Sequence, residues 1–309
     1  MKPLAVCLMG PTASGKTDVA VALAQRLPVE LISVDSALVY RGMDIGTAKP
    51  DRETLTKAPH RLIDIRDPED SFSAGDFVRH ARQAIDEIRH DDKLPLLVGG
   101  TMMYFRALTA GLAELPEADE TIRAELDEEA DRLGWPVLHE RLADCDPESA
   151  ARINPNDSQR IQRALEVFLV SGRSLSDWQA RRDDTEADID YLKLGLVVEP
   201  RKLLHERIEQ RLNMIVNNGL EEEVKALMRR ESLTREHSSM RSVGYRQFWE
   251  YLEGEISLDR AIEKTLYATR QLAKRQITWM RSEKDLRVFD ALDSGTIDAI
   301  EAVLVEKLP

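Results

Sequence analysis

The chain has 309 residues, 42% of them hydrophobic, which is enough to bury a sizeable core in one large domain with an insertion or in two domains. We see no targeting signal and no window near the ~20 uninterrupted apolar residues of a membrane span, and we expect a cytoplasmic protein. Two cysteines exclude a disulfide framework and a cysteine zinc site, and the six histidines show no ligand spacing.

The net charge of −13 is unevenly distributed along the chain. Residues 114–150 contain thirteen Asp or Glu against three Arg, so the remainder is close to neutral. The overall acidity therefore does not exclude a face that binds RNA.

The first predicted elements are a buried strand over 4–9 and a helix over 18–27, joined by Gly10-Pro-Thr-Ala-Ser-Gly-Lys-Thr17. This spacing is that of a phosphate-binding loop, in which glycines let backbone N–H groups turn toward phosphate oxygens and the following helix adds its dipole. Lys16 supplies a mobile positive charge, and the Thr17 hydroxyl can reach Mg²⁺. The sequence predicts a phosphate binder but does not say which phosphate it binds.

The next strand, over 30–35, ends on Asp35, and a long loop follows over 35–50. Asp35 has two interpretations from spacing alone, a general base or the Mg²⁺ ligand of a phosphate-loop hydrolase. A later buried strand, 94–98, ends in Gly99-Gly100-Thr101, where a hydrolase might place its acid. That weakens the hydrolase interpretation and leaves a kinase possible.

Between these strands we expect a helix over 51–58, a strand over 60–65 and a helix capped by Ser73 that runs to residue 90. Strands that alternate with helices indicate a parallel sheet with ligands at the carboxyl ends of its strands. Lys16, Asp35 and Thr101 all fall at such ends.

From 113 to 186 the pattern becomes consecutively helical, over 117–133, 136–144, 157–171 and 174–181. We therefore expect an inserted all-helical domain at 113–186 within an α/β core made of 1–112 and 187–309. The core resumes with an apolar run at 191–198, and the expected elements after it are two helices flanking 217–219, helices over 245–253 and 257–281, a strand at 287–289 and a terminal helix. The predicted fold class is α/β, a P-loop NTPase-like parallel sheet flanked by helices.

Basic residues form two further candidate clusters, and Arg123 is a third candidate by itself. Arg270, Lys274 and Arg281 lie within ~40° of one another on a helical wheel, as either a solvated face or a surface for phosphate or RNA. Asp157-Ser158 can cap a helix whose first turns present Gln159, Arg160, Gln162 and Arg163. Arg123, the single basic residue between 114 and 131, is either a salt-bridge partner or a ligand contact.

Several blocks together resemble one known family. They are the phosphate loop, Asp35-Ser36 with Tyr40-Arg-Gly-Met-Asp-Ile-Gly-Thr-Ala-Lys-Pro50, Val98-Gly-Gly-Thr101, Ser242-Val-Gly-Tyr-Arg-Gln247 and Thr269-Arg-Gln-Leu-Ala-Lys-Arg-Gln276. In this order, through nearly the whole chain, they resemble the bacterial tRNA dimethylallyltransferases, also called tRNA isopentenyltransferases.

The resemblance implies transfer of a dimethylallyl group from dimethylallyl diphosphate to the exocyclic N6 amine of the adenosine immediately 3′ of the anticodon, with release of diphosphate. Asp35 matches the family's base, Thr101 a residue that hydrogen-bonds at the reaction centre, and Arg211 an arginine that assists the diphosphate. Mg²⁺ is the implied cofactor, with Thr17 as its ligand. The donor diphosphate would be bound by Gly10, Pro11, Thr12, Ala13, Ser14, Gly15, Lys16 and Thr17.

The resemblance also implies that the target base is flipped out of the anticodon stem-loop and that the 113–186 domain grips the anticodon loop. Many family members have Gln at the position of Leu38, which places a side-chain contact to the base there in doubt. The expected tRNA contacts are Asp35, Ser36, Ala37, Leu38, Thr101, Arg123, Gln159, Arg160, Ile161, Gln162, Arg163, Met240, Arg241, Ser242, Val243, Gly244, Tyr245, Arg246, Arg270 and Lys274. The expected partners are tRNA and dimethylallyl diphosphate, with no membrane and with the protein as a monomer.

Two other functions remain open at this point. An adenylate isopentenyltransferase would use the same donor and fold with a free nucleotide as acceptor, and a small-molecule kinase would bind ATP at the same loop. ATP consumption would identify the kinase, whereas diphosphate release that depends on tRNA would identify the tRNA-modifying transferase.

Overall fold

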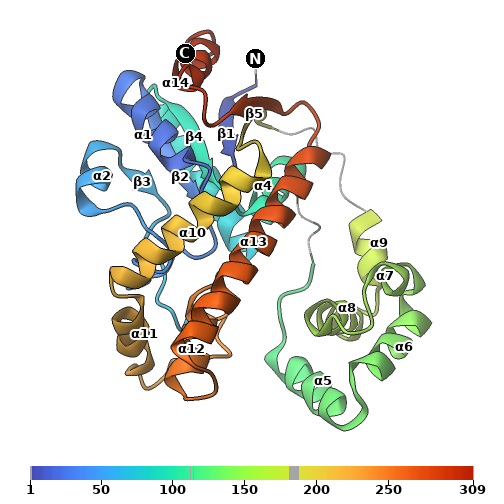
Figure 1. The fold of residues 1–309 in the computed structure, drawn as a ribbon. Coiled ribbons are helices and arrows are strands. Elements are labelled where there is room, and N and C mark those ends of the chain that lie inside the picture. The colour runs from blue at the N-terminus through green and yellow to red at the C-terminus, as the bar shows by residue number, and fades with distance from the viewer. Residues whose placement is uncertain (1, 112, 114, 181–187, 309) are drawn as a thin grey trace. The chain divides into compact units, whose positions relative to one another are not determined.

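The computed structural model describes residues 2–111, 113, 115–180 and 188–308, shown in Figure 1. The chain divides into two compact units, one made of 1–109 with 187–309 and one made of 110–186. Residues 112, 186 and 187, at the predicted domain boundaries, lie outside the described residues, as does residue 181, the predicted end of a helix.

The first unit is built on a six-stranded sheet in the order β3-β2-β4-β1-β5-β6, and every neighbouring pair is parallel. Gly99 is in register with both Met9 and Val34, so the central strands β1, β4 and β2 end level with one another. This sheet confirms the predicted fold class. The strands are β1 (Leu4–Met9), β2 (Val29–Val34), β3 (His60–Arg61), β4 (Leu94–Gly99), β5 (Asp190–Val197) and β6 (Arg287–Asp290).

β3 is shorter than the strand predicted over 60–65, because Leu62 and Asp64 adopt positive φ angles of 64° and 56°. An extended strand cannot pass through that left-handed conformation, so pairing with β2 stops at Arg61.

Helices cover both faces of the sheet, and the alternating side chains of β1 show how. Ala5 and Cys7 belong to one hydrophobic core, whereas Val6 and Leu8 belong to a second, packed with α1 and α14. Both faces of the central strands are therefore covered by apolar side chains and shielded from solvent, as a parallel sheet requires. The accompanying helices are α1 (Lys16–Arg26), α2 (Arg52–Lys57), α3 (Ala74–His90), α4 (Met102–Ala110), α10 (Arg201–Asn217), α11 (Leu220–Met228), α12 (Tyr245–Leu252), α13 (Leu258–Ser282) and α14 (Thr296–Val305).

Local sequence explains where α3 begins. The Ser73 hydroxyl accepts a hydrogen bond from the Asp76 N–H at 3.1 Å, and the Asp76 carboxylate accepts one from the Ser73 N–H at 3.0 Å. This reciprocal capping box confirms the predicted helix start.

The sequence did not predict α4, whose side chains are apolar on several faces and so lack a clear helical period.

The second unit is helical and has its own hydrophobic core, formed by residues that include Leu126, Leu138, Leu142 and Leu165. Its helices are α5 (Glu120–Leu133), α6 (Trp135–Cys145), α7 (Pro147–Arg152), α8 (Ser158–Ser171) and α9 (Leu175–Ala180). The six-residue α7 was not predicted.

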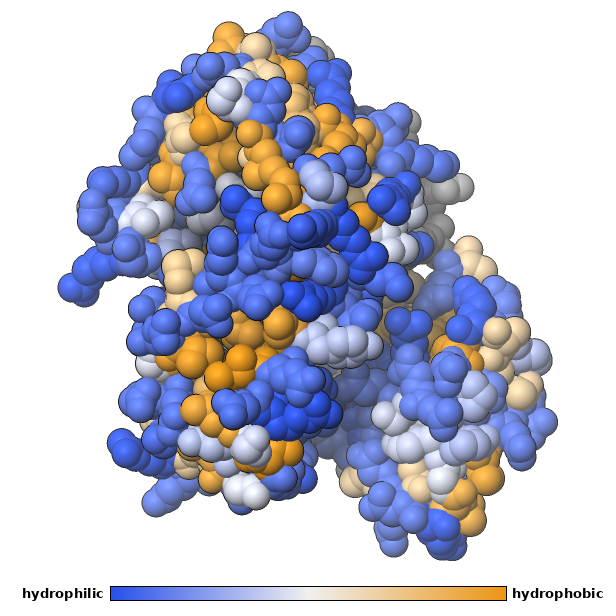
Figure 2. All heavy atoms as spheres, viewed as in Figure 1, coloured by the Kyte–Doolittle hydropathy of each residue, from blue (hydrophilic) through white to orange (hydrophobic). Residues whose placement is uncertain are grey.

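Hydrophilic residues cover most of the face drawn in Figure 2, and apolar residues occur there in separate groups. Among the described residues, no helix combines the length and apolarity that crossing a membrane requires.

Candidate active site

The phosphate loop, residues 10–17, joins β1 to α1 at the carboxyl edge of the sheet. Ala13 and Gly15 turn it through left-handed conformations, with φ of 62° and 88°. At Gly10 a Cβ atom would lie 2.7 Å from the Ser14 Oγ, so any larger residue would displace the loop. The loop therefore leads directly into the positive N-terminal end of α1, a geometry suited to anions.

Lys16 is half-buried at the start of α1, and its Nζ donates to the backbone oxygen of Pro11 at 3.2 Å. Burial and the positive charge of Arg211 lower the pKa of Lys16 to about 8, and the negative charge of Asp35 opposes that shift. The two cations, Lys16 and Arg211, lie close enough to repel each other, and an anionic ligand would relieve that repulsion.

Arg211 comes from α10, and its Nη2 donates to the backbone oxygen of Thr47 at 3.1 Å. Burial lowers the pKa of this guanidinium, and Asp35 and Asp18 act in the opposite direction. One helical turn earlier, Arg207 donates from Nε to the backbone oxygen of Ala13 at 2.8 Å. The i, i+4 spacing of the two arginines thus turns one face of α10 toward the phosphate loop and the Thr47 carbonyl.

Asp35 directly follows β2, and its Oδ1 accepts hydrogen bonds from the backbone N–H groups of Ala37 at 2.8 Å and Leu38 at 3.3 Å. These bonds fix the turn after the strand and the orientation of the carboxylate. The hydrogen bonds found in the described part of the chain use only Oδ1, so Oδ2 is available to a substrate proton.

Thr101 lies beside this turn because β2 and β4 approach very closely at their ends. A Cβ at Gly99 would lie 2.0 Å from the Val34 carbonyl oxygen, so only glycine permits the approach. The Thr101 Oγ1 accepts a hydrogen bond from the Ser36 N–H at 3.1 Å. The structure therefore brings together Lys16, Asp35, Thr101 and Arg211, which are far apart in the sequence.

Gln276 of α13 is a site residue that the sequence reasoning missed. Its Oε1 accepts from the Thr12 N–H at 2.9 Å, and its Nε2 donates to the Gly100 carbonyl oxygen at 2.8 Å. One buried amide thus connects the phosphate loop to the turn that precedes Thr101. Gln276 ends one of the sequence blocks that carry the family resemblance, but that helix was interpreted only for its basic stripe. Arg207 was missed in the same way, although it lies one helical turn before the predicted Arg211.

In the helical unit, the predicted tRNA residues fall into two groups. Arg123 and Arg163 both form ion pairs with Glu166, whose side chain is fully buried, at 2.9 Å and 2.7 Å. The Ile161 side chain is also fully buried, in the core of this unit. Of the predicted tRNA residues on α8, the exposed ones are Gln159 and Arg160, whose side chain is 71% exposed.

The predicted segment 240–246 likewise mixes buried and exposed residues. Met240 and Tyr245 have no exposed surface, whereas Arg241 and Arg246 are exposed. Side-chain contacts to RNA from this segment are therefore open to the two arginines and to the half-buried Ser242 and Val243, but not to Met240 or Tyr245. Among the other predicted contacts, Ser36 is exposed, and Ala37, Leu38, Gln162, Ser242 and Val243 are half-buried.

On α13, Lys274 and Arg281 are exposed, while the Arg270 Nη2 pairs with the Glu209 carboxylate at 3.0 Å. Part of the predicted basic stripe is therefore neutralised by α10. Of the two stripe residues predicted to contact tRNA, Arg270 and Lys274, only the second presents its charge to solvent.

The site combines a phosphate loop at the end of β1, two cations beside that loop and a carboxylate at the end of a nearby strand. This combination defines an α/β protein that acts on a phosphorylated ligand. The model of the family described as IPP transferase matches residues 38–283. The chain belongs to this family, which confirms the resemblance seen in its sequence blocks.

Solved structures agree with that assignment. A full-length tRNA isopentenylpyrophosphate transferase from Bacillus halodurans is 39% identical, with a TM-score of 0.73 over 99% of this chain and 97% of that one. A tRNA delta(2)-isopentenylpyrophosphate transferase from Staphylococcus epidermidis is 34% identical, with a TM-score of 0.70 over 99% and 100%. A eukaryotic dimethylallyltransferase acting on tRNA is 25% identical, with a TM-score of 0.78 over 99% and 80%.

Proposed function

We propose that the chain transfers a dimethylallyl group from dimethylallyl diphosphate to the N6 amine of the adenosine 3′-adjacent to a tRNA anticodon. The observation that carries the proposal is the convergence of Lys16, Arg211 and Asp35, whose charges act on one another at the carboxyl edge of the sheet. An allylic diphosphate needs cations for its leaving group, and an amine acceptor needs a base. This site offers both.

The donor diphosphate lies against the phosphate loop in this proposal. The Ser14 Oγ supports it, because that atom is buried and has no hydrogen-bond partner among the described residues. A buried hydroxyl without a partner is costly, and a phosphate oxygen would supply the missing bond. Lys16, Arg211 and the N-terminus of α1 then stabilise the negative charge that develops on the diphosphate as the allylic C–O bond breaks.

The acceptor amine is a weak nucleophile because its lone pair is delocalised into the purine. As the N6–carbon bond forms, the amine loses a proton, and Asp35 accepts it at Oδ2 while Oδ1 stays bonded to the backbone of the turn. Thr101 is attached to the same turn through the Ser36 N–H, which supports its proposed role of hydrogen-bonding at the reaction centre.

Mg²⁺ fits this site as an ion that binds together with the donor diphosphate. Within the described ranges, no group of three or more His, Cys, Asp or Glu side chains could bind a metal, so the protein alone offers few ligands. Thr17, in the first turn of α1, would contribute its hydroxyl, and diphosphate oxygens would supply others. Bound there, Mg²⁺ would neutralise charge on the leaving diphosphate.

We assign binding of the tRNA anticodon loop to the helical unit together with exposed basic residues of the first unit. Gln159 and Arg160 support this role on α8, as do Arg241, Arg246 and Lys274 elsewhere. Their amide, guanidinium and ammonium groups suit phosphates and unstacked bases.

The test is to incubate the protein with labelled dimethylallyl diphosphate and unmodified tRNA and to analyse the nucleosides. We expect label on an adenosine beside the anticodon, together with tRNA-dependent diphosphate release. Parallel reactions with AMP as acceptor and with ATP as donor separate the alternatives. Labelled AMP without labelled tRNA, or ATP consumption without prenyl transfer, would overturn the proposal.

A further inference from the structure

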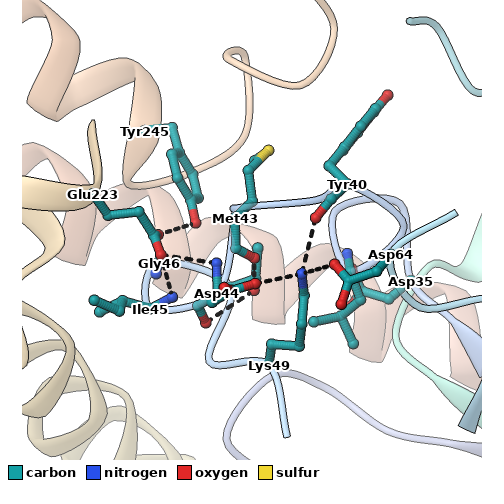
Figure 3. A network of polar contacts seen from close by, with 12 residues as sticks. Asp35, Tyr40, Met43, Asp44, Ile45, Gly46, Lys49, Asp64, Glu223 and Tyr245 are labelled. Atoms are coloured by element: carbon teal, nitrogen blue, oxygen red, sulfur yellow. Dashed lines mark hydrogen bonds and ion pairs between the residues drawn. The ribbon is translucent and has the colours of Figure 1, made fainter. Parts of the chain in front are cut away.

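Glu223 of α11 binds a turn far away in the sequence, as Figure 3 shows. Its Oε2 accepts hydrogen bonds from the backbone N–H groups of Asp44 at 2.9 Å and Ile45 at 2.7 Å, and its Oε1 accepts one from Gly46 at 2.9 Å. Three consecutive N–H groups thus converge on one carboxylate, an arrangement in which charge-assisted bonds fix the path of the chain.

Tyr245 of α12 completes this arrangement. Its hydroxyl donates to the Glu223 Oε1 at 2.5 Å, and its ring packs so closely on Gly46 that a Cβ there would lie 2.6 Å away. Burial and the negative charge of Glu223 raise the pKa of Tyr245, so the phenol remains protonated and continues to donate. Glu223 therefore has four donors around its two oxygens.

The next residue of the turn connects this arrangement to the donor site. The Thr47 carbonyl oxygen accepts the hydrogen bond from the Arg211 Nη2 at 3.1 Å. Arg211 also lines a pocket of about 810 Å³ together with Ile45 and Met214. The 44–47 backbone therefore supplies an acceptor that helps to fix the guanidinium of Arg211.

On its other side the turn is fixed by Lys49. Its Nζ donates to the Tyr40 carbonyl oxygen at 2.9 Å and pairs with Asp44 at 2.6 Å and Asp64 at 2.5 Å, as Figure 3 shows. The ammonium group of Lys49 is thereby occupied by protein partners. Glu223 is the carboxylate that accepts from the backbone N–H groups of this turn, and Arg211 donates to the carbonyl that follows them.

We propose that Glu223 is a positioning residue for the donor diphosphate, acting through the 44–46 backbone and the Thr47 carbonyl on Arg211. This proposal rests on the proposed function, because it takes the anion beside Arg211 to be the diphosphate of the prenyl donor. Glu223 itself touches neither substrate.

The experiment measures the affinity of the full chain for inorganic diphosphate by calorimetry and the donor KM and kcat with tRNA. Glu223→Gln keeps the volume but removes one acceptor, and Glu222→Gln is the matched control, since it makes the same charge change at an exposed neighbour on α11. We expect Glu223→Gln to weaken diphosphate binding and raise the donor KM by about tenfold, in the middle of the range for coupled contacts. The control and the tRNA affinity should not change.

A double-mutant cycle with Arg211→Ala separates positioning from general destabilisation. If Glu223 acts through Arg211, Glu223→Gln has little further effect on diphosphate affinity once Arg211 is absent. Additive losses, or unchanged affinity in a folded Glu223→Gln protein, would overturn the proposal.

If Glu223→Gln does not fold, Tyr245→Phe answers the same question, because it removes one donor to Glu223 and leaves the three N–H bonds in place. A smaller loss of diphosphate affinity that vanishes in the Arg211→Ala background supports the proposal, and unchanged affinity overturns it. Because diphosphate binding is measured without prenyl transfer, a wild-type protein that binds diphosphate but transfers no prenyl group refutes the proposed function separately.

Discussion

Lys16 has a pKa of about 8 because it is buried beside Arg211, and this gives the donor affinity a distinct pH dependence. In the proposed function the protonated form of Lys16 binds the diphosphate, and that form disappears as pH rises through the lowered pKa. We expect the donor KM to rise roughly tenfold between pH 7 and pH 9, the consequence of one proton leaving the site.

Steady-state kinetics across that pH range measure the effect. Lys16→Arg keeps its charge throughout and should show no such dependence, whatever its absolute activity. Lys16→Ala should abolish prenyl transfer and leave tRNA binding largely intact. A wild-type donor KM that stays flat to pH 9 would contradict the assigned role.

Asp35 is either a general base or a metal ligand. The two interpretations predict different kinetic defects for Asp35→Asn. Asp35→Asn keeps an Oδ1 that can accept from Ala37 and Leu38, so the turn should persist while the proton acceptor is removed. We expect donor and tRNA binding to remain and the chemical step to fall by about 10² or more. Single-turnover rates across a Mg²⁺ titration decide between the two, and substantial rescue by Mg²⁺ would falsify the base assignment.

At the scale of elements, α8 and α13 show that basic residues close in sequence have unequal roles. Arg163 compensates the buried Glu166, so removing it also disturbs the fold. Arg270 pairs with the exposed Glu209, so part of its charge is already neutralised. Arg160 and Lys274 are better positions for testing tRNA binding by substitution, because both side chains are exposed.

We therefore expect Arg160→Ala with Lys274→Ala to weaken tRNA binding and to flatten the dependence of log affinity on log salt. The slope should fall by about one for each phosphate that the variant no longer neutralises. Filter binding or fluorescence anisotropy at several salt concentrations measures this. Lys202→Ala, at an exposed position of α10, is the control. Unchanged slopes would show that these are ordinary solvated faces.

At the scale of the whole molecule, the helical unit has its own core and so can unfold separately from the sheet. The Leu142 side chain is fully buried in that core. We expect Leu142→Ala to lower the free energy of unfolding of this unit by about 2–5 kcal/mol, as for other buried leucines.

Tryptophan fluorescence and calorimetry should then show an earlier transition for the helical unit, with reduced tRNA binding and unchanged diphosphate binding. Val137→Ala, at a partly exposed position of the same helix, is the control. A single transition shifted as a whole, with both ligands affected equally, would contradict the independence of the two units.

Sequence alone determined the parallel α/β fold, the phosphate loop and the family. The phosphate loop is encoded locally: an apolar strand followed by glycines at fixed spacing, then a helix, specifies it because backbone geometry restricts what those residues can do. The family came from the resemblance of several blocks spread along the chain. The positions of Asp35 and Thr101 at strand ends also followed, since parallel strands end at the same edge of a sheet.

Only the tertiary structure decided which side chains complete the site and which lie beneath it. Gln276 and Glu223 act on loops more than a hundred residues away, and no local pattern marks a polar residue for such a contact. The buried Tyr245, and Arg163 paired with Glu166, look like surface ligands in the sequence for the same reason. Whether a polar side chain binds a substrate or another part of the chain depends on packing between distant segments, and helical or strand periodicity carries no record of that packing.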